Sequence, residues 1–132
     1  MPRHLLLIAL LLLQPVIING SRADSAVEAG EALYAICSGC HSPSYHRTGP
    51  AHCRLVGRRA GSQPGFLYSD AMQQSDIIWN ESTLDRFLTS PLTMIPGTTM
   101  TFAGIDMAAK RQQLIQYLMS LDAHHPLCQQ DS

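Results

Sequence analysis

The segment CSGCH, residues 37–41, contains two cysteines separated by two residues, with a histidine directly after the second. On an exported chain this spacing is typical of covalent haem attachment. The thiols of Cys37 and Cys40 can add to the two haem vinyl groups across one helical turn, and the imidazole of His41 is then placed to reach the iron. The motif therefore predicts one haem c per chain, anchored by Cys37 and Cys40 and ligated by His41.

Three other uses of these side chains are alternatives to haem attachment. A thioredoxin-like redox pair needs a preceding strand in a βαβ unit, which this sequence lacks. A zinc site needs further ligands at finger-like spacing. A plain structural disulfide between Cys37 and Cys40 is the third alternative. Haem attachment is the favoured interpretation of the four.

The N-terminus has the layout of a secretory signal peptide. A short basic segment precedes an apolar run of 14 residues, 5–18, that is interrupted by a glutamine and a proline. A membrane-spanning helix needs roughly 20 apolar residues, so a retained membrane anchor is the less favoured alternative. Ser21 and Ala23 are small residues at the positions that a signal peptidase reads. We expect residues 1–23 to be a signal peptide and residues 24–132 to be the mature domain.

Length and charge limit the class of protein. The chain has 132 residues, enough for one small domain. Residues 24–132 carry six Arg and one Lys against ten Asp and Glu, which gives a charge of about −3. This balance argues against a nucleic-acid binder. Export implies an oxidising compartment in which paired cysteines persist as disulfides.

Two helices are predicted on either side of the middle of the chain. Residues 26–37, AVEAGEALYAIC, have apolar residues at helical spacing and lead into the CSGCH motif. Asn80 is suited to be the N-cap of a second, short helix that ends at Pro91, with Trp79 and Leu84 as a hydrophobic staple.

A third helix is predicted from near Asp106 to a point before Pro126. Its apolar face repeats at the spacing of one helical stripe and consists of Leu114, Ile115, Tyr117, Leu118 and Leu121. We find no run with strand periodicity that is long enough to propose a sheet. An all-α fold with long loops is therefore expected.

The longest loop, 42–65, contains four glycines and three prolines and has no sustained apolar periodicity. A loop of this length in a small domain is usually disordered or wrapped around a ligand. The chain also has few aromatic residues, so burial of a flat apolar cofactor would supply the missing core. We expect no stable fold without haem.

A single histidine leaves a second axial position on the iron, and a methionine thioether there suits electron transfer. Met1 belongs to the leader, and four of the other methionines have ordinary packing interpretations: Met72, Met94, Met107 and Met119. Met100 lies in IPGTTMTFAG, where Pro96 and Gly97 form a turn that can present a side chain inward. On these grounds alone the choice stays open.

The motifs together resemble class I cytochrome c, the mitochondrial type and its soluble bacterial relatives. The resemblance covers residues 26–121 and rests on segments in the family's order and approximate spacing: CSGCH, TGPAHCRLVGRRAG, PGFLYSDAM, Trp79, LDRFL, IPGTTMTFAGI and LIQYL. It implies the class I cytochrome c fold, with helices and long loops wrapped around one covalently bound haem c.

The resemblance also implies roles for single residues. Met100 is the sixth ligand, and the carbonyl of Pro50 accepts a hydrogen bond from the other ring nitrogen of His41. His46 ties two loops together, and Phe102 lies beside the exposed haem edge. Four residues match those that hydrogen-bond the buried haem propionates: Arg58, Tyr68, Trp79 and Thr98. Without the resemblance, Arg58 would be interpreted as a solvated surface charge and Trp79 as a residue of the core.

Two positions depart from the mitochondrial pattern beside the methionine ligand. Phe87 stands where a tyrosine is usual, and Met72 stands where an asparagine is usual. Neither side chain has the polar group that would hold a buried water. We expect a drier pocket and a tighter bond between iron and sulfur.

The lysines that surround the haem edge in electrostatically docking members of the family are missing. The matching positions here are Leu92, Thr93, Thr99, Asp106 and Met107. Lys110 is the only lysine, and Arg47 is the one cation expected near the edge. Docking should be mainly apolar and only slightly salt-dependent. Any alkaline form should use hydroxide or another ligand in place of lysine.

Two cysteines remain outside the motif, Cys53 and Cys128. The resemblance puts the first in the loop on the histidine side, in the neighbourhood of the chain's end, so a disulfide between them is expected. Such a bridge would stabilise the fold by up to roughly 4.5 kcal/mol in the chain-entropy model. Unbridged thiols or an intermolecular link are the alternatives. His52, His124 and His125 receive no assigned chemistry.

The sequence therefore predicts a soluble periplasmic electron-transfer protein, not an enzyme, whose iron cycles between ferric and ferrous states. Its donor would be a quinol-oxidising cytochrome complex or a dehydrogenase, and its acceptor an oxidase, a peroxidase or a photosynthetic reaction centre. A monomer is expected, without nucleic-acid partners or membrane insertion after signal cleavage. The alternatives are a dedicated electron-transfer subunit of a periplasmic dehydrogenase and, less favoured, a haem peroxidase or gas sensor with an open sixth position.

Overall fold

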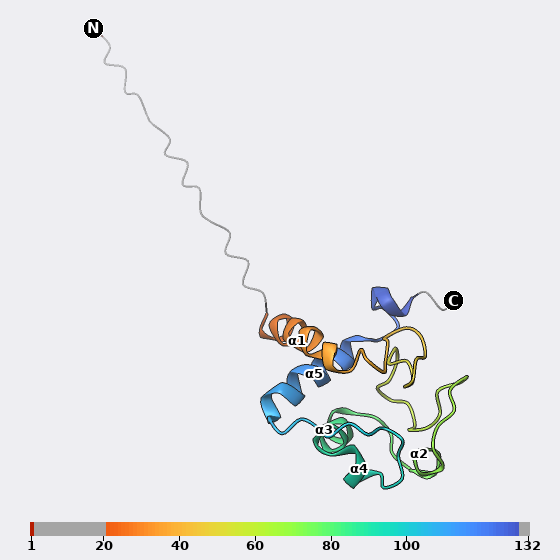
Figure 1. Ribbon diagram of the computed structural model, residues 1–132. Helices are drawn as coiled ribbons and strands as arrows, with labels where there is room; N and C mark the ends of the chain where they lie inside the picture. The colour runs from red at the N-terminus through yellow and green to blue at the C-terminus, as the bar shows by residue number, and fades with distance from the viewer. Residues whose placement is uncertain (2–20, 130–132) are drawn as a thin grey trace.

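Helices from the two ends of the chain lie against each other in the computed structural model, which describes Met1 and residues 21–129 (Figure 1). They are α1 (Arg22–Leu33) and α5 (Ala108–Ser120). Gly30 is buried where they meet, and a Cβ atom there would overlap the backbone carbonyl oxygen of Gln113. A glycine is therefore required for the close approach of α1 to α5.

The first helix begins with a capping box. Ser21 Oγ accepts a hydrogen bond from the backbone N–H of Ala23 (3.1 Å), and the carboxylate of Asp24 accepts one from the N–H of Ser21 (3.1 Å). The chain continues as the 3₁₀ helix η1 (Tyr34–Ile36). The prediction of a helix over 26–37 is confirmed in type, although the helix begins earlier and tightens to 3₁₀ geometry before the motif.

Three short helices follow the long loop: α2 (Asp70–Gln74), α3 (Glu81–Thr89) and α4 (Pro91–Met94). Asn80 is the N-cap of α3, as predicted, and its Oδ1 accepts the N–H of Thr83 at 3.0 Å. Pro91 does end α3, but it also opens α4, because the first turn of a helix tolerates proline. Neither α2 nor α4 was predicted from the sequence.

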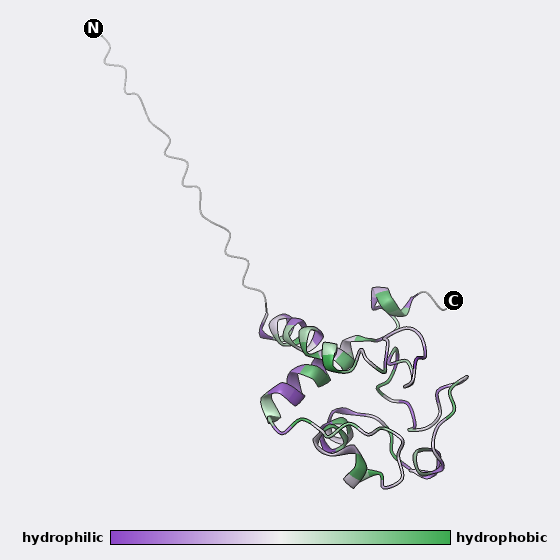
Figure 2. Ribbon diagram, in the orientation of Figure 1, coloured by the Kyte–Doolittle hydropathy of each residue, from purple (hydrophilic) through white to green (hydrophobic). Residues whose placement is uncertain are grey.

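The predicted apolar stripe of the C-terminal helix forms the centre of the core. All five of its residues are at most 4% exposed: Leu114, Ile115, Tyr117, Leu118 and Leu121. In Figure 2 the ribbon of α5 carries both hydrophobic and hydrophilic stretches, as one buried face requires. The helix begins at Ala108, with Met107 as its N-cap, slightly later than predicted. The 3₁₀ helix η2 (Pro126–Cys128) follows it.

β-structure over residues 21–129 is limited to one isolated bridge between Arg59 and Ile78. The fold is all-α, as expected. No helix in this part of the chain is both long enough and apolar enough to cross a membrane. The predicted signal peptide falls mainly on residues 2–20, which lie outside the described residues.

Two cross-links hold the loop 42–65. His46 accepts the N–H of Ala51 at Nδ1 (3.0 Å) and donates from Nε2 to the carbonyl of Pro64 (2.9 Å), so it joins two distant parts of this one loop. Cys53 and Cys128 form a disulfide, with their Cα atoms 5.4 Å apart. This bridge fastens the loop to η2, and the loop is thereby fixed on the side of the molecule that carries CSGCH.

Candidate functional site

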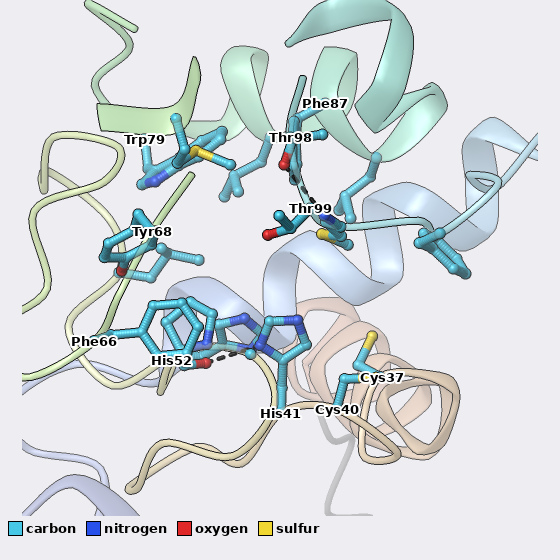
Figure 3. A pocket seen from close by; sticks show the side chains of 18 of the residues that line it. Cys37, Cys40, His41, His52, Phe66, Tyr68, Trp79, Phe87, Thr98 and Thr99 are labelled. Carbon is cyan, nitrogen blue, oxygen red and sulfur yellow. Dashed lines mark hydrogen bonds between the residues drawn. The ribbon is translucent and has the colours of Figure 1, made fainter. Parts of the chain in front are cut away.

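A cavity of about 350 Å³ is lined by residues from most segments of the described chain (Figure 3). Much of its wall is apolar and comes from the core: Leu55, Leu84, Phe87, Leu88, Leu114 and Leu118. Some lining residues are exposed and mark where the cavity reaches the surface: Ile36, Cys40, Thr99 and Thr101. The space suits a flat apolar group that is buried except at one edge.

The CSGCH motif forms a tight turn directly after η1. The N–H groups of Cys40 and His41 both donate to the carbonyl of Cys37, at 3.0 Å and 2.9 Å. This turn brings the two cysteine side chains to the same side of the cavity, beside the imidazole (Figure 3). Neither cysteine belongs to a disulfide. Burial, reinforced by Cys40, raises the pKa of Cys37 to about 11, so its thiol is protonated at neutral pH.

His41 is 8% exposed and lines the cavity. Its Nδ1 lies 2.8 Å from the carbonyl oxygen of Pro50. A carbonyl can only accept, so Nδ1 carries the proton and Nε2 keeps its lone pair. Burial lowers the pKa of His41, while the bond to Pro50 acts in the opposite direction. Since no described residue bonds Nε2, this atom is available to a metal in the cavity.

The wall across the cavity from His41 carries Thr98 and Thr99 in Figure 3. The next residue, Met100, also lines the cavity, and its N–H donates to Thr98 Oγ1 at 3.3 Å. Gly97 supports the turn with φ +92°, a conformation that favours glycine. Among the methionines in the described part of the chain, the cavity is lined by Met72 and Met100. The turn that the sequence singled out therefore does bring a thioether to this space.

All four residues expected to contact haem propionates line the same cavity: Arg58, Tyr68, Trp79 and Thr98. The guanidinium of Arg58 donates to the carbonyls of Cys53 (3.1 Å) and Ala51 (3.3 Å), which fixes it along the loop. Burial lowers its pKa, while Tyr68 acts in the opposite direction. Burial raises the pKa of Tyr68, so its hydroxyl stays a hydrogen-bond donor. The interpretation of Arg58 as a solvated surface charge does not fit this position.

The two departures beside the expected methionine ligand are both buried in the cavity wall. Met72 is 8% exposed and Phe87 is 6% exposed. The ring centroid of Phe87 lies 5.0 Å from that of Trp79, so an aromatic pair closes this wall. This wall offers no polar group from either side chain.

His52 lines the cavity, although no role was predicted for it from the sequence. Its ring stacks on that of His41, with centroids 4.2 Å apart and planes inclined by 24°. Its Nδ1 is hydrogen-bonded to the hydroxyl of Tyr34 at 2.9 Å. Burial is the main cause that lowers the pKa of His52 well below its ordinary value. A histidine eleven positions after the motif has no local pattern that reveals such a contact.

Comparison with known proteins decides the family. Cytochrome c2 of Rhodomicrobium vannielii is 40% identical over 92 residues, which cover 67% of this chain and 74% of that protein. Cytochrome c of Euglena viridis is 38% identical over 97 residues, covering 71% and 95%. The structure of cytochrome cH from Methylobacterium extorquens superposes with a TM-score of 0.70 at 35% identity, covering 71% of this chain and 97% of that one. The chain belongs to the class I cytochrome c family.

No family model matches the chain, so membership in the cytochrome c family rests on these relatives and on the site. As a member, the protein carries one covalently attached haem c. It is an electron-transfer protein and not an enzyme.

The residues of the cavity fit this cofactor. Two unbridged thiols lie at one edge, and an imidazole with an available Nε2 lies beside them. The remaining wall is mostly apolar, with polar side chains in a few places. This donor set suits a macrocycle that is bonded at its rim, ligated at its metal and otherwise surrounded by hydrocarbon.

Proposed function

We propose that the protein is a soluble periplasmic electron carrier whose haem iron is ligated by His41 and Met100. The observation that carries this proposal is the presence, around one cavity, of both thiols of CSGCH, the oriented imidazole of His41 and the thioether of Met100. When bound, the haem supplies an iron that accepts and returns one electron. A thioether as second ligand favours the ferrous state and closes the metal to other molecules.

The chain's own residues hold and insulate this group. Cys37 and Cys40 fix its edge, and the carbonyl of Pro50 keeps His41 in the tautomer that can ligate. The apolar wall excludes water. This lowers the reorganisation energy of electron transfer, because few solvent dipoles have to reorient when the charge on the iron changes. The carboxylate groups of the haem propionates would be met by the polar residues of the cavity: Arg58, Tyr68, Trp79 and Thr98.

The choice of Met100 can be tested against the other cavity methionine. Met100→Ala should abolish the strongly upfield methyl signal that a ligating methionine gives in the proton NMR spectrum of the ferrous protein. Met72→Ala, the matched control, should keep that signal because its sulfur is not bonded to iron. If Met72→Ala loses the signal and Met100→Ala keeps it, the ligand has been assigned to the wrong residue.

The cavity wall formed by Phe87 and Met72 determines how much water can lie near the ligating sulfur. Because Phe87 and Met72 offer no polar group, we expect a dry pocket and a ligand that is retained at mildly alkaline pH. With Lys110 as the only lysine of the chain, a lysine-ligated alkaline form should be absent. Early loss of the methionine signal as the pH rises would contradict this.

Export to the periplasm rests on the leader, residues 1–23. We expect mass spectrometry of the mature protein to give a chain that begins at Asp24 and carries one haem, recovered in the periplasmic fraction. Cleavage before Asp24 would remove both hydrogen bonds of the capping box of α1, because Ser21 is the acceptor in one of them and the donor in the other. A mature protein that retains residues 1–23 in the membrane fraction would refute export with cleavage.

The partners are other redox proteins: a quinol-oxidising cytochrome complex or a dehydrogenase as donor, and an oxidase, a peroxidase or a reaction centre as acceptor. A permanent place in one dehydrogenase is the second candidate. It is favoured by the exposure of Leu92 (48%) and Met107 (57%), two positions that match the rim of the haem edge in the family. Purification from the native source distinguishes the two, because a dedicated subunit would elute with its dehydrogenase and a carrier would elute alone.

A further inference from the structure

The segment 49–53 runs along the CSGCH turn and presents several groups to His41. The N–H of Gly49 donates to the carbonyl of Cys40 (2.7 Å), and the N–H of His52 donates toward the carbonyls of Ser42 (3.2 Å) and Pro43 (3.0 Å). The same segment supplies the Pro50 carbonyl to His41 Nδ1. It also supplies the ring of His52, which Figure 3 shows beside that of His41.

The two imidazoles form a parallel stack. A centroid distance of 4.2 Å and an angle of 24° place the planes in direct contact. Rotation of the His41 ring about its Cβ–Cγ bond would break this contact and the bond from Nδ1 to Pro50 together. A Cβ at Gly49 would overlap the same ring, so backbone also packs against it. The orientation of His41 is thus restricted by three neighbours.

The imidazole of His52 is itself fixed by contacts with Tyr34. Its Nδ1 is bonded to the hydroxyl of Tyr34 at 2.9 Å, and the two rings meet edge to face with centroids 5.7 Å apart. Tyr34 is 6% exposed and packs edge-on against Tyr117 of α5, with centroids 5.2 Å apart. The stacked imidazoles are therefore connected to the crossing of α1 and α5, the most extensive helix contact of the fold.

The backbone on the other side of His52 is also fixed. The next residue, Cys53, is bridged to Cys128, which is 2% exposed. The N–H of Arg54 donates to the carbonyl of Leu121 at 2.7 Å. A leucine could fill the place of His52 without the free-energy cost of desolvating an imidazole. Packing alone therefore does not explain why a histidine with a hydrogen bond to Tyr34 occupies this position.

We propose that His52, held by Tyr34 and by the adjacent disulfide, is a positioning residue that sets the ring orientation of the iron's histidine ligand. The inference rests on the proposed function for the ligation by His41, and it goes beyond the ligand set and its bond to Pro50. The neutral ring acts through contact and polarity, not as a carrier of protons. Because the plane of an axial imidazole governs how unpaired spin spreads over ferric haem, the orientation has a spectroscopic signature.

The test uses the ferric holoprotein and four variants. His52→Leu removes both the stack and the hydrogen bond. His52→Phe keeps a flat ring on His41 but loses the bond to Tyr34. Tyr34→Phe keeps every ring and removes only the hydroxyl. His124→Leu, a change of the same kind at an exposed histidine, is the matched control. The readouts are the hyperfine-shifted proton signals of the haem methyls and of the His41 ring, together with the midpoint potential.

We expect His52→Leu to change the order or spread of the haem-methyl shifts and to raise the midpoint potential, since a less polar surrounding disfavours the more highly charged ferric state. His52→Phe should largely restore the shift pattern without restoring the potential. Tyr34→Phe should move both readouts less, in the direction of His52→Leu, and His124→Leu should move neither. These outcomes separate orientation from polarity.

Wild-type shifts and potential in both His52→Leu and Tyr34→Phe would overturn the inference. If His52→Leu does not fold with haem, Tyr34→Phe decides alone, because it leaves the core volume almost unchanged: a wild-type spectrum and potential would overturn the proposal. Failure of the proposed function is distinct, since wild-type protein would then lack the low-spin spectrum of histidine-ligated iron before any substitution is made.

Discussion

At the scale of single residues, Arg111 shows how one buried charge joins two helices. Its Nε donates to Asp85 Oδ1 of α3 at 2.9 Å, and one terminal nitrogen donates to the carbonyls of Ile105 (2.7 Å) and Asp106 (2.9 Å). Arg111 is 9% exposed, whereas the Asp85 side chain is 32% exposed. The guanidinium therefore satisfies several acceptors that its removal would leave unpaired.

We expect Arg111→Ala to lower the free energy of unfolding by about 2 kcal/mol, toward the low end for a buried pair because Asp85 still reaches solvent. Chemical denaturation of the holoprotein measures this. Arg86→Ala, at an exposed position of α3, is the control and should stay within about 0.5 kcal/mol of wild type. Equal losses in the two variants would show that the buried pair contributes no more than a surface charge.

Tyr34 gives a prediction about pH. Burial is the main cause that raises the pKa of its hydroxyl well above the ordinary value near 10. Above pH 10 the tyrosine ionises in the unfolded chain but stays protonated in the folded one. Ionisation therefore lowers the free energy of the unfolded state relative to the folded state. The stability that Tyr34 contributes is complete below about pH 10 and falls by up to about 1.4 kcal/mol per pH unit above it.

Tyr34→Phe lacks this loss. The difference in unfolding free energy between wild type and Tyr34→Phe should be constant up to about pH 9 and should then shrink as the pH rises. Denaturant titrations at a series of pH values test it. Tyr45→Phe, at a residue that is 60% exposed, should run parallel to wild type throughout. A difference from Tyr34→Phe that stays constant at high pH would contradict the predicted burial effect.

At the scale of elements, the crossing of α1 and α5 depends on a glycine, Gly30, at the point of contact. Gly30→Ala would place a methyl group against the Gln113 carbonyl oxygen and 2.8 Å from Tyr117 Cβ. Backbone cannot yield easily, so we expect a loss of about 2 kcal/mol and a fall in the melting temperature of roughly 10 °C. Gly39→Ala, where nothing lies within 4 Å of the new Cβ, is the control. A Gly30→Ala protein that melts like Gly39→Ala would show that the helices can separate at little cost.

Some helices can be predicted from the sequence and others cannot. The stripe of α5 and the N-cap Asn80 are local signals that repeat at helical spacing or precede a helix directly, and both were correctly identified. α2 and α4 contain only five and four residues, too few for a periodicity to show. The 3₁₀ end of α1 is a detail of a helix terminus, where the last turn is often 3₁₀ and patterns in the sequence do not fix the boundary.

The site divides in the same way. CSGCH is a short motif whose spacing carries its chemistry. Met100 was chosen among the methionines only through the resemblance to the family, and the structure lines one cavity with both the motif and Met100. The stack of His52 on His41 depends on a loop that returns beside the motif and on Tyr34, which is 18 positions away. No periodic pattern connects these residues, and a lone histidine gives no signal of its own because histidine is intermediate between the buried and the exposed residue types. The structure was needed to find them.

At the scale of the whole molecule, charge determines how partners approach. Residues 24–132 carry about −3, and positions that match the family's lysine ring hold neutral or acidic residues. Two of them, Leu92 and Met107, are about half exposed. Arg47 is engaged with its own chain, since it donates to the carbonyl of Ser38 at 2.7 Å. Such a surface offers little long-range attraction to an acidic partner.

We therefore expect weak dependence of electron transfer on salt. The rate of oxidation of the ferrous protein by the anion ferricyanide should not fall between low and physiological ionic strength, because the two reactants carry charge of the same sign, whereas reactions steered by opposite charges slow about 10-fold or more. The double variant Thr99→Lys and Met107→Lys should make the rate fall steeply with added salt. A steep fall already in the wild-type protein would show that a cationic surface guides small anions to the haem edge.

The central claim, that His41 and Met100 together close the iron for electron transfer, is tested most directly by the absorption spectrum of the purified ferric holoprotein. We expect the weak red charge-transfer band that a methionine sulfur gives to ferric iron, and slow or absent binding of cyanide. A missing band together with immediate cyanide binding would contradict the claim, because the sixth position would then be open.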